Sequence, residues 1–334
     1  MERIAFISDD IFIYWSSIVL ALAATAAAAI YAVFYLNKSR KFLATGLSVV
    51  LTVALALPMA RLVHWYCQHI QYPGFREAMT DYSSGGFALL GVFMACLVTA
   101  GLLRLVRISS NLPQMLDCMA IGGGVGIAIG RLAAVFNSSD RGMILPESVQ
   151  FPFAASIANP VSGAQENRLA TFMLQSALVA VIVAGLLVFM LVQNLRKKKI
   201  ADGEVFFIFL LAYGASQALC DSMRYDKMFF RSNGFVGMVQ IMGLLGMLIS
   251  IVLFSVRMVK GRGLKIWQFV IWTGILGLLG MAGYMEYFVQ RNGHKAAFAY
   301  SIMGLCLVCV VILGLVIRAL IHKKAPPKGG RYLK

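Results

Sequence analysis

The chain alternates long apolar stretches with short polar segments. A helix that crosses a bilayer needs about 20 mostly apolar residues. Nine stretches approach this length, namely 11–36, 44–66, 85–104, 115–136, 169–195, 204–222, 235–257, 265–289 and 297–318. Pro58 and Arg61 interrupt the second stretch, which is therefore the least regular. The pattern predicts an all-α, polytopic integral membrane protein with about nine transmembrane helices.

The composition agrees with a membrane environment. Of the 334 residues, 60% are hydrophobic and 13% are charged, and the mean hydropathy is +0.80. A soluble domain of this length carries more charge. The first apolar stretch is too long for the core of a signal peptide and follows Glu2, Asp9 and Asp10, so we expect a retained helix rather than a cleaved leader.

Basic residues cluster at alternate ends of the apolar stretches, as the positive-inside rule requires. Nineteen of the 30 lysines and arginines fall on one side, namely Lys38, Arg40, Lys41, Arg104, Arg107, Arg196, Lys197, Lys198, Lys199, Arg257, Lys260, Arg262, Lys265, Arg318, Lys323, Lys324, Lys328, Arg331 and Lys334. We therefore predict that the amino terminus lies outside and the carboxyl terminus inside. The net charge of +16 comes from basic residues in short loops between apolar stretches, where they set the topology and face anionic lipid headgroups. We therefore expect no nucleic-acid partner.

No metal or cofactor motif is complete. Cys306 and Cys309 have the spacing of a metal or redox pair, but no second Cys or His pair accompanies them, and packing thiols are the simpler interpretation. The glycines between Gly122 and Gly126 lack the Lys-Ser/Thr ending of a phosphate loop. We expect neither a metal nor a cofactor.

A first polar feature is Arg131, which ends a glycine-rich apolar stretch. Gly122, Gly126 and Gly130 recur every four residues, so they share one helix face and permit close approach of a neighbouring helix. An arginine that faces lipid costs about 3 kcal/mol even on lenient insertion scales. We therefore expect Arg131 to lie at a tightly packed helix interface. There it either holds an anionic ligand or only pairs with Asp140 or Asp221 and so holds the helices together.

A second polar feature is a stripe on the stretch 204–222 and its outer end. Tyr213, Gln217, Asp221 and Arg224 fall within an arc of about 80° at 100° per residue. Such a stripe must face protein or a wet cavity rather than lipid. Two interpretations stay open: a hydrogen-bond network with Asp221 paired to Arg224, or an anionic ligand such as a lipid phosphate held by Arg131 and Arg224.

The segment GRLAAVFNSSDRG resembles the signature of bacterial prolipoprotein diacylglyceryl transferases, which reads roughly Gly-Arg-x-Gly-Asn-Phe-x-Asn-x-Glu-x-x-Gly. The segment DGEVFFIFLLAYGASQALCDSMR resembles a later helix of the same family, with Asp221 in place of its Glu. The matching positions of the two segments are Gly130, Arg131, Phe136 (shifted by one), Asn137, Gly142, Gly203, Tyr213, Gly214 and Arg224, and weaker echoes are Arg61, Gly85, Gly86, Gly91, Asp117 and Gln240. The resemblance covers roughly residues 10–262.

The resemblance implies a seven-helix transferase domain over residues 1–262, followed by an additional two-helix hairpin with a basic cytoplasmic tail over 263–334. It implies a location in the bacterial cytoplasmic membrane. It also implies transfer of a diacylglyceryl group from phosphatidylglycerol, or another anionic phospholipid, to the lipobox cysteine of a preprotein.

The same resemblance implies roles for individual residues. Arg131 and Arg224 would clamp the phosphate, and Asn137 and Gly142 would position the headgroup. The remaining implied residues are Arg61 and Gln240 in lipid binding, Tyr213 and Asp221 as candidates for proton handling, and Arg131 also as a catalytic residue.

The chain departs from the family pattern at positions that matter for the reaction. Leu90 stands where the family has a histidine, Ala134 where it has an asparagine, and Gln217 where it has an arginine. The glutamate of the family signature aligns with Ser139, and the acidic residue Asp140 follows one position later. Two alternatives therefore stay open beside the transferase: a catalytically impaired paralogue that binds phospholipid, and a transporter. No internal repeat of the kind common in transporters is visible.

The orientation leads to a first test. A reporter active only in the cytoplasm should give signal when fused after Lys334 and stay silent when inserted in the loop 137–168, because the basic clusters retain the carboxyl end inside. The reverse pattern of signals would overturn the orientation.

Overall fold

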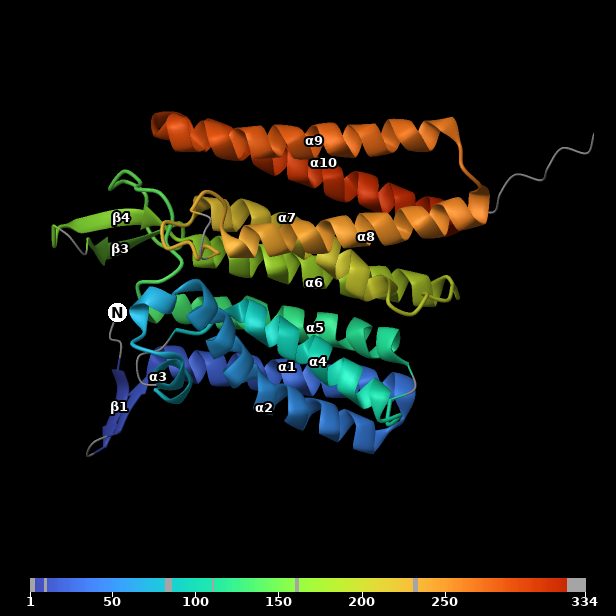
Figure 1. Cartoon of the computed structure of the whole chain (residues 1–334), viewed down its shortest axis with the longest axis horizontal. Helices are drawn as coiled ribbons and strands as arrows, with labels where there is room; N and C mark the ends of the chain where they lie inside the picture. The colour runs from blue at the N-terminus through green and yellow to red at the C-terminus, as the bar shows by residue number, and fades with distance from the viewer. Residues whose placement is uncertain are drawn as a thin grey trace, which may run out of the picture. The chain divides into compact units, whose positions relative to one another are not determined.

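Long helices make up most of the computed structural model of the chain (Figure 1). The structure describes residues 4–8, 11–81, 86–109, 111–159, 162–230 and 234–322. Several residues used above lie outside this described part, namely Glu2, Asp9, Asp10, Gly85, Lys323, Lys324, Lys328, Arg331 and Lys334.

Each predicted apolar stretch coincides with a helix. The helices are α1 (Trp15–Ser39), α2 (Phe42–Cys67), α3 (Phe75–Thr80), α4 (Leu89–Leu105), α5 (Leu112–Arg131), α6 (Thr171–Leu195), α7 (Glu204–Met223), α8 (Met238–Arg262), α9 (Ile266–Arg291) and α10 (Ala296–His322). Within the described residues, eight helices are long and apolar enough to cross a membrane, and the 17-residue α4 is shorter. The polytopic helical membrane protein is thus confirmed, whereas the count of nine crossings and the orientation stay predictions.

The ends of the predicted stretches differ from the helix bounds, most clearly in the first stretch and the fourth. Residues Ile11–Tyr14 are not helical but form strand β2, which pairs antiparallel with β1 (Ile4–Ser8). Their aromatic and β-branched side chains suit an extended backbone. The stretch predicted to end at residue 136 leaves the α-helix at Arg131 and continues as a 3₁₀ turn, η2 (Leu132–Phe136). Conversely, Pro58 does not divide α2, which is one helix.

A second hairpin lies between α5 and α6. Strands β3 (Ala154–Ala158) and β4 (Gln165–Leu169) pair antiparallel, with Ala154 opposite Leu169. Two further 3₁₀ turns, η1 (His69–Gln71) and η3 (Gly293–Lys295), follow α2 and α9. Figure 1 shows both hairpins at the same end of the first unit's helices.

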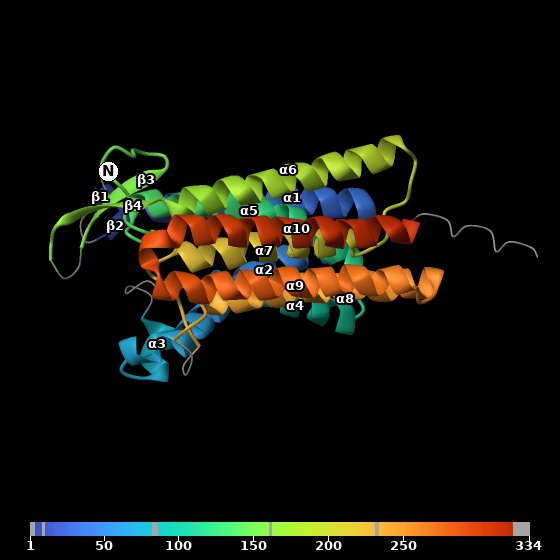
Figure 2. The ribbon, with the colours of Figure 1, turned by 90° about the horizontal axis from the view of Figure 1, so that it is seen from above.

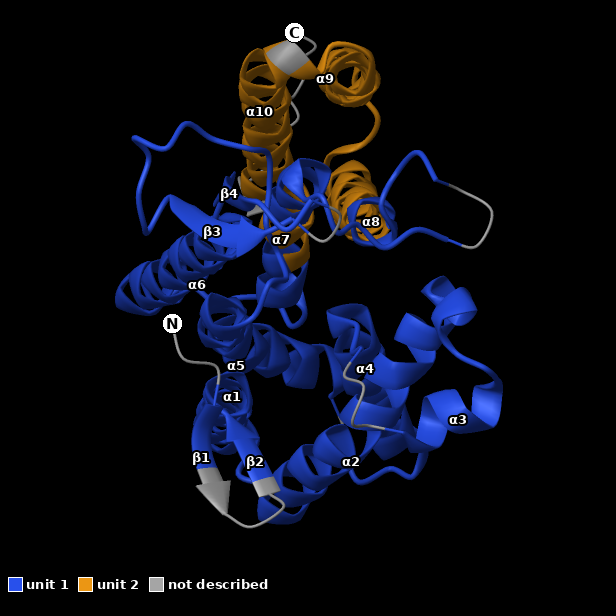
Figure 3. Cartoon of the chain, turned by 90° about the vertical axis from the view of Figure 1, so that its left-hand side faces the viewer, with its two compact units in different colours: residues 1–209, 216–241 blue, residues 210–215, 242–334 orange. Residues whose placement is uncertain are grey.

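The chain divides into two compact units (Figure 3). The first contains residues 1–209 and 216–241, and the second contains residues 210–215 and 242–334. In the second unit α9 packs along α10, and the backbones of Gly214 and Gly243 approach each other closely. The predicted domain boundary after residue 262 stays a prediction.

Within the first unit, α5 packs against both α1 and α6 (Figures 1 and 2). A Cβ added at Gly122 would lie 2.6 Å from the carbonyl oxygen of Ala27, and one at Gly126 would lie 2.8 Å from the Ala27 Cβ. Gly130 makes ordinary contact with Ala23. The predicted close approach at this glycine face is therefore confirmed, and α1 is the neighbour.

A buried carboxylate joins α5 to α7 at the other end of α5. Asp117 accepts hydrogen bonds from the backbone N–H groups of Gly203 (2.9 Å) and Phe206 (2.8 Å). These N–H groups begin α7 and have no partner within the helix itself. Asp117 is therefore the cap of α7, although it lies far from α7 in sequence.

The glycine face leads to a second test. Gly122→Ala should lower the free energy of unfolding by about 1–3 kcal/mol, because the new Cβ meets backbone atoms of Ala27 and Tyr31 that cannot withdraw. Gly123→Ala is the matched control, since a Cβ there has nothing within 4 Å among the described atoms. Thermal unfolding in detergent measures both. Equal stability of the two variants would contradict the close packing.

Candidate functional site

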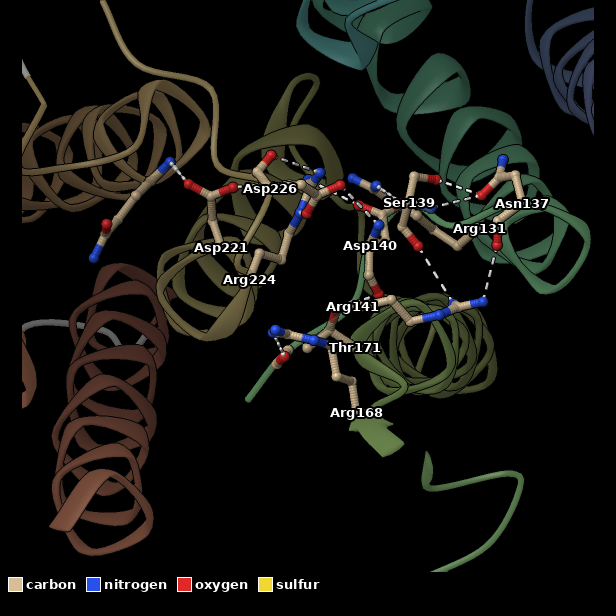
Figure 4. A network of polar contacts seen from close by, with 12 residues as sticks. Arg131, Asn137, Ser139, Asp140, Arg141, Arg168, Thr171, Asp221, Arg224 and Asp226 are labelled. Atoms are coloured by element: carbon tan, nitrogen blue, oxygen red, sulfur yellow. Dashed lines mark hydrogen bonds and ion pairs between the residues drawn. The ribbon is translucent and has the colours of Figure 1, made fainter. Parts of the chain in front are cut away.

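The candidate site is centred on the buried carboxylate of Asp140, which two arginines share (Figure 4). Nη1 of Arg131 lies 3.0 Å from Oδ2 of Asp140, and Nη1 of Arg224 lies 2.8 Å from Oδ1. Arg131 is the last residue of α5, and Arg224 directly follows α7. One carboxylate thus joins the ends of two helices that are far apart in the sequence.

Two further carboxylates surround Arg224. Its Nε lies 3.0 Å from Oδ1 of Asp226, and its Nη1 lies 3.8 Å from Oδ1 of Asp221. Burial disfavours the charged guanidinium, but Asp140, Asp226 and Asp221 outweigh burial and raise the pKa of Arg224. Arg224 therefore stays fully charged. The interpretation of Asp221 as a partner of Arg224 is confirmed by this geometry.

The backbone of Asp140 is fixed on both sides. Its N–H donates to Oδ2 of Asp226 (3.0 Å), and its carbonyl oxygen accepts from Oγ1 of Thr171 (2.5 Å) and from the N–H of Phe172 (3.2 Å). Burial opposes ionisation of the carboxyl group, but Arg131 and Arg224 outweigh burial and hold the pKa of Asp140 below its ordinary value. The carboxylate is therefore ionised at neutral pH.

Arg141 holds the loop that carries Asp140. Its Nη2 donates to the carbonyl oxygens of Ala134 (3.0 Å) and Asn137 (2.9 Å), its Nη1 donates to that of Ser139 (3.3 Å), and the guanidinium lies 4.4 Å from the ring centre of Phe172. Burial lowers the pKa of Arg141. This arginine orders the segment 134–139 against the start of α6.

Asn137 and Gly142, both predicted to position a headgroup, have defined local roles. Oδ1 of the exposed Asn137 accepts from the backbone N–H (3.0 Å) and Oγ (2.6 Å) of Ser139, which closes a turn. The N–H of Gly142 donates to Leu169 (2.8 Å), and its carbonyl oxygen accepts from Arg168 (3.2 Å). Both backbone groups of Gly142 are therefore already engaged within the protein.

A Cβ at Gly142 would contact the start of α6 and the end of α7 together. It would lie 2.9 Å from Cγ2 of Thr171 and 3.1 Å from the carbonyl oxygen of Met223. This position therefore requires the smallest residue, and it shows that the two helix ends lie side by side.

The structure places the other predicted residues as follows. Gln240, at the start of α8, is buried and donates its backbone N–H to Oδ2 of Asp221 (3.3 Å), so it joins the network. Tyr213 is also buried, on α7, but belongs to the second unit, and its role stays a prediction.

Arg61 is engaged by a different part of the first unit. Its fully buried guanidinium donates to the carbonyl oxygens of Ala78 (2.6 Å), Asp81 (2.5 Å) and Gly86 (3.1 Å). It also lies over the ring of Tyr72 at 4.7 Å. These contacts fasten the segment after α2 to α2 itself, and the predicted lipid contact of Arg61 stays a prediction.

Sequence reasoning missed two partners of the network, Asp226 and Thr171. Asp226 follows Arg224 by two residues, a spacing that brings no contact within a helix. The contact exists because α7 ends at Met223 and the backbone of Arg224 is extended rather than helical. For Thr171, no pattern in the sequence indicated the bond.

A cavity of about 520 Å³ opens beside the network. It is bounded by Arg141, Phe172, Glu166 and Phe151, and by residues of β3 and β4. Because Arg141 also orders the Asp140 loop, this cavity and the ion network share a wall. The described residues contain no group of three or more His, Cys, Asp or Glu side chains placed to hold a metal ion.

Comparisons with known proteins identify one family. The model of the prolipoprotein diacylglyceryl transferase family matches residues 3–256, a range that includes every residue of the Asp140 network. No curated protein matches the chain.

The charge balance leads to a third test. Asp140→Asn should lower the free energy of unfolding by about 3 kcal/mol, because Arg131 and Arg224 lose the carboxylate they share. Since the pKa of Asp140 is depressed in the folded state, its contribution is present above the ordinary carboxyl pKa of about 3.9 and is lost as the pH falls further.

Thermal unfolding in detergent between pH 7 and pH 3 checks both points. Between pH 7 and pH 3 the stability of the variant should fall less than the stability of wild type. Glu166→Gln, which disrupts an ion pair of the hairpin with Arg168, is the control and should change stability less. A wild-type and an Asp140→Asn profile that run parallel would contradict the assignment.

Proposed function

The chain belongs to the prolipoprotein diacylglyceryl transferase family, and from this premise we propose that it transfers the diacylglyceryl group of phosphatidylglycerol to the lipobox cysteine of a preprotein. The donor binds through its phosphate at Arg131 and Arg224. The acceptor approaches from the side of the cavity beside Arg141, which provides room for an extended segment. The protein works in the cytoplasmic membrane of a bacterium.

The observation that carries the proposal is the pairing of two guanidiniums with two oxygens of one group. Asp140 presents one oxygen to each arginine, at 3.0 and 2.8 Å. A phosphodiester also presents two unesterified oxygens from one centre, and guanidinium groups bind such oxygens with charge-assisted hydrogen bonds. In this structure the carboxylate of Asp140 therefore stands where we propose the phosphate oxygens bind.

The proposed reaction uses this anion site for the leaving group. The thiolate sulfur of the acceptor attacks the glyceryl carbon that carries the phosphate, the C–O bond breaks, and glycerol phosphate leaves with the electron pair. A thioether remains, and the thiol proton passes to a base. Arg131 and Arg224 stabilise the charge that develops on the phosphate. Asp221 and Tyr213 are the proposed proton acceptors.

The departures from the family pattern support a second candidate function, a phospholipid-binding protein without transferase activity. Leu90 is an apolar residue in α4, and Gln217 is a buried neutral residue in α7. Loss of one charged contact to a developing oxyanion costs on the order of 3 kcal/mol, roughly a hundredfold in rate. Lipid binding at Arg131 and Arg224 needs neither of the missing groups.

The two functions and the anion site are tested together as a fourth prediction. Phosphatidylglycerol binding and thermal stability should be measured for wild type, Arg131→Lys, Arg131→Ala and Arg224→Ala in detergent. Arg131→Ala should weaken binding by about tenfold or more, because a charge-assisted hydrogen bond contributes about 1.5–3 kcal/mol. The affinity of Arg131→Lys should lie between those of wild type and Arg131→Ala, because lysine keeps the charge but lacks the planar guanidinium group.

Arg76→Ala in the exposed turn α3 is the control for the loss of one positive charge. Unchanged affinity with lowered stability would leave Arg131 as a purely structural ion-pair partner. Incubation with a lipobox peptide then separates the candidates. A thioether product supports the transferase, whereas lipid binding without any product supports the second function.

A further inference from the structure

Two buried glutamines near the ion network have no use in the proposed reaction. Gln175 of α6 and Gln217 of α7 each expose only 1% of their surface. Neither the oxygen nor the nitrogen of either side-chain amide has a hydrogen-bond partner within the described part of the chain. A primary amide offers two donors and an acceptor oxygen, and burying these groups unmatched is unfavourable.

Both glutamines lie one helical turn below the ion network. Gln175 follows Thr171, which bonds Asp140, by four residues, and Gln217 precedes Asp221 by four residues. Residues four apart share a helix face and are separated by about 6 Å along the axis. Each amide therefore lies on the face that the network residue of its own helix uses, but deeper in the helix bundle.

The two helices are neighbours at this depth. At one end, a Cβ at Gly142 would meet both Thr171 and Met223. Further along, a Cβ at Gly124 of α5 would lie 2.5 Å from Val183 of α6 and 3.1 Å from Phe209 of α7. Gln175 and Gln217 are each eight residues from that second contact, about 12 Å towards Asp140. They therefore lie at matching heights on α6 and α7, between two places at which one residue approaches both helices.

We propose that the amides of Gln175 and Gln217 bind the ester groups of the glycerolipid, which makes them determinants of specificity for an acyl-ester lipid. This inference rests on the proposed binding of the phosphate at Arg131 and Arg224. In a glycerophospholipid the ester carbonyls follow the phosphate by a few bonds, in the direction of the acyl chains. They are neutral acceptors, and a neutral amide N–H is their natural donor.

The proposal also explains the residue type at position 217. The family pattern has an arginine there, which suits a phosphate oxygen. Glutamine cannot supply that charge, but it can donate to a carbonyl without bringing an unpaired cation into the bundle. In this chain the substitution shifts the contact from the ionic headgroup to the neutral glyceryl region.

A lipid pair that differs only in the carbonyls tests the proposal. Binding of diacyl phosphatidylglycerol and of its dialkyl-ether analogue should be measured for wild type, Gln175→Met, Gln217→Met and the double variant. Methionine keeps the length of the side chain and removes its hydrogen bonds. Wild type should prefer the ester lipid by about fivefold for each hydrogen bond made. Each variant should lose affinity for the ester lipid alone, and the double variant should bind both lipids equally.

Three further measurements keep the outcomes separate. Gln193→Met, near the other end of α6, is the matched control and should keep the preference for the ester lipid. Arg131→Ala should lower the affinity for both lipids by the same factor. If this variant binds both lipids as wild type does and keeps the preference for the ester lipid, the result contradicts the phosphate site but not the role of the glutamines. Equal wild-type affinities for the two lipids overturn the glutamine proposal. A preference that survives in the double variant, with lowered thermal stability, also overturns it and leaves the amides a structural role.

Discussion

The site depends on one electrostatic constraint: two mostly buried guanidiniums can lie close together only if an anion lies between them. Asp140 supplies this anion to Arg131 and Arg224. Isolated charges in a bundle of apolar helices are costly, and Asp140 offsets part of this cost for both arginines, beside the contacts of Arg224 with Asp226 and Asp221. Through these two ion pairs the carboxylate connects the end of α5, the residue after α7 and the loop between α5 and α6.

The same constraint shapes any interaction with an anionic lipid. Arg224 already faces three carboxylates, and Asp140 is held by its backbone to Thr171 and Asp226. A phosphate that enters adds negative charge beside the carboxylates that already contact these arginines. Under the proposed function, binding would therefore exchange one anion for another at the arginines, and the side chain of Asp140 would have to give up at least one of its two contacts. A measured binding free energy would then be the difference between the free energy of the phosphate contact and that of the carboxylate contact with the arginines.

The sequence was sufficient for features that repeat along a helix. Apolar length predicted the long helices, the spacing of Gly122, Gly126 and Gly130 predicted the close contact with α1, and the stripe ending at Arg224 predicted a buried polar face. These features follow from helix geometry alone. The strand β2 was missed because four apolar residues that precede a helix have the same hydrophobicity as the helix.

Contacts made by loops could not be predicted from the sequence. The pairing of Arg131 with Asp140 was one of the interpretations that the sequence left open, but the position of Asp140 between two arginines depends on how the segment 137–142 folds back. Asp226 reaches Arg224 only after the helix has ended, and the partners of Arg61 are main-chain carbonyls, which every residue possesses. The backbone hydrogen bonds of a loop leave no pattern in residue types.

The cap at the start of α7 has a mechanical consequence. Asp117 ties α5 to the first turn of α7, and Asp140 ties the last residue of α5 to the residue after α7. The two attachment points on α5 are about 21 Å apart along the axis. Because α5 and α7 are connected at both ends, a movement of one helix relative to the other has to break one of these carboxylate contacts. The two ends of α7 are therefore expected to move together with α5, and under the proposed function the opening for a two-tailed lipid would have to lie between other helices.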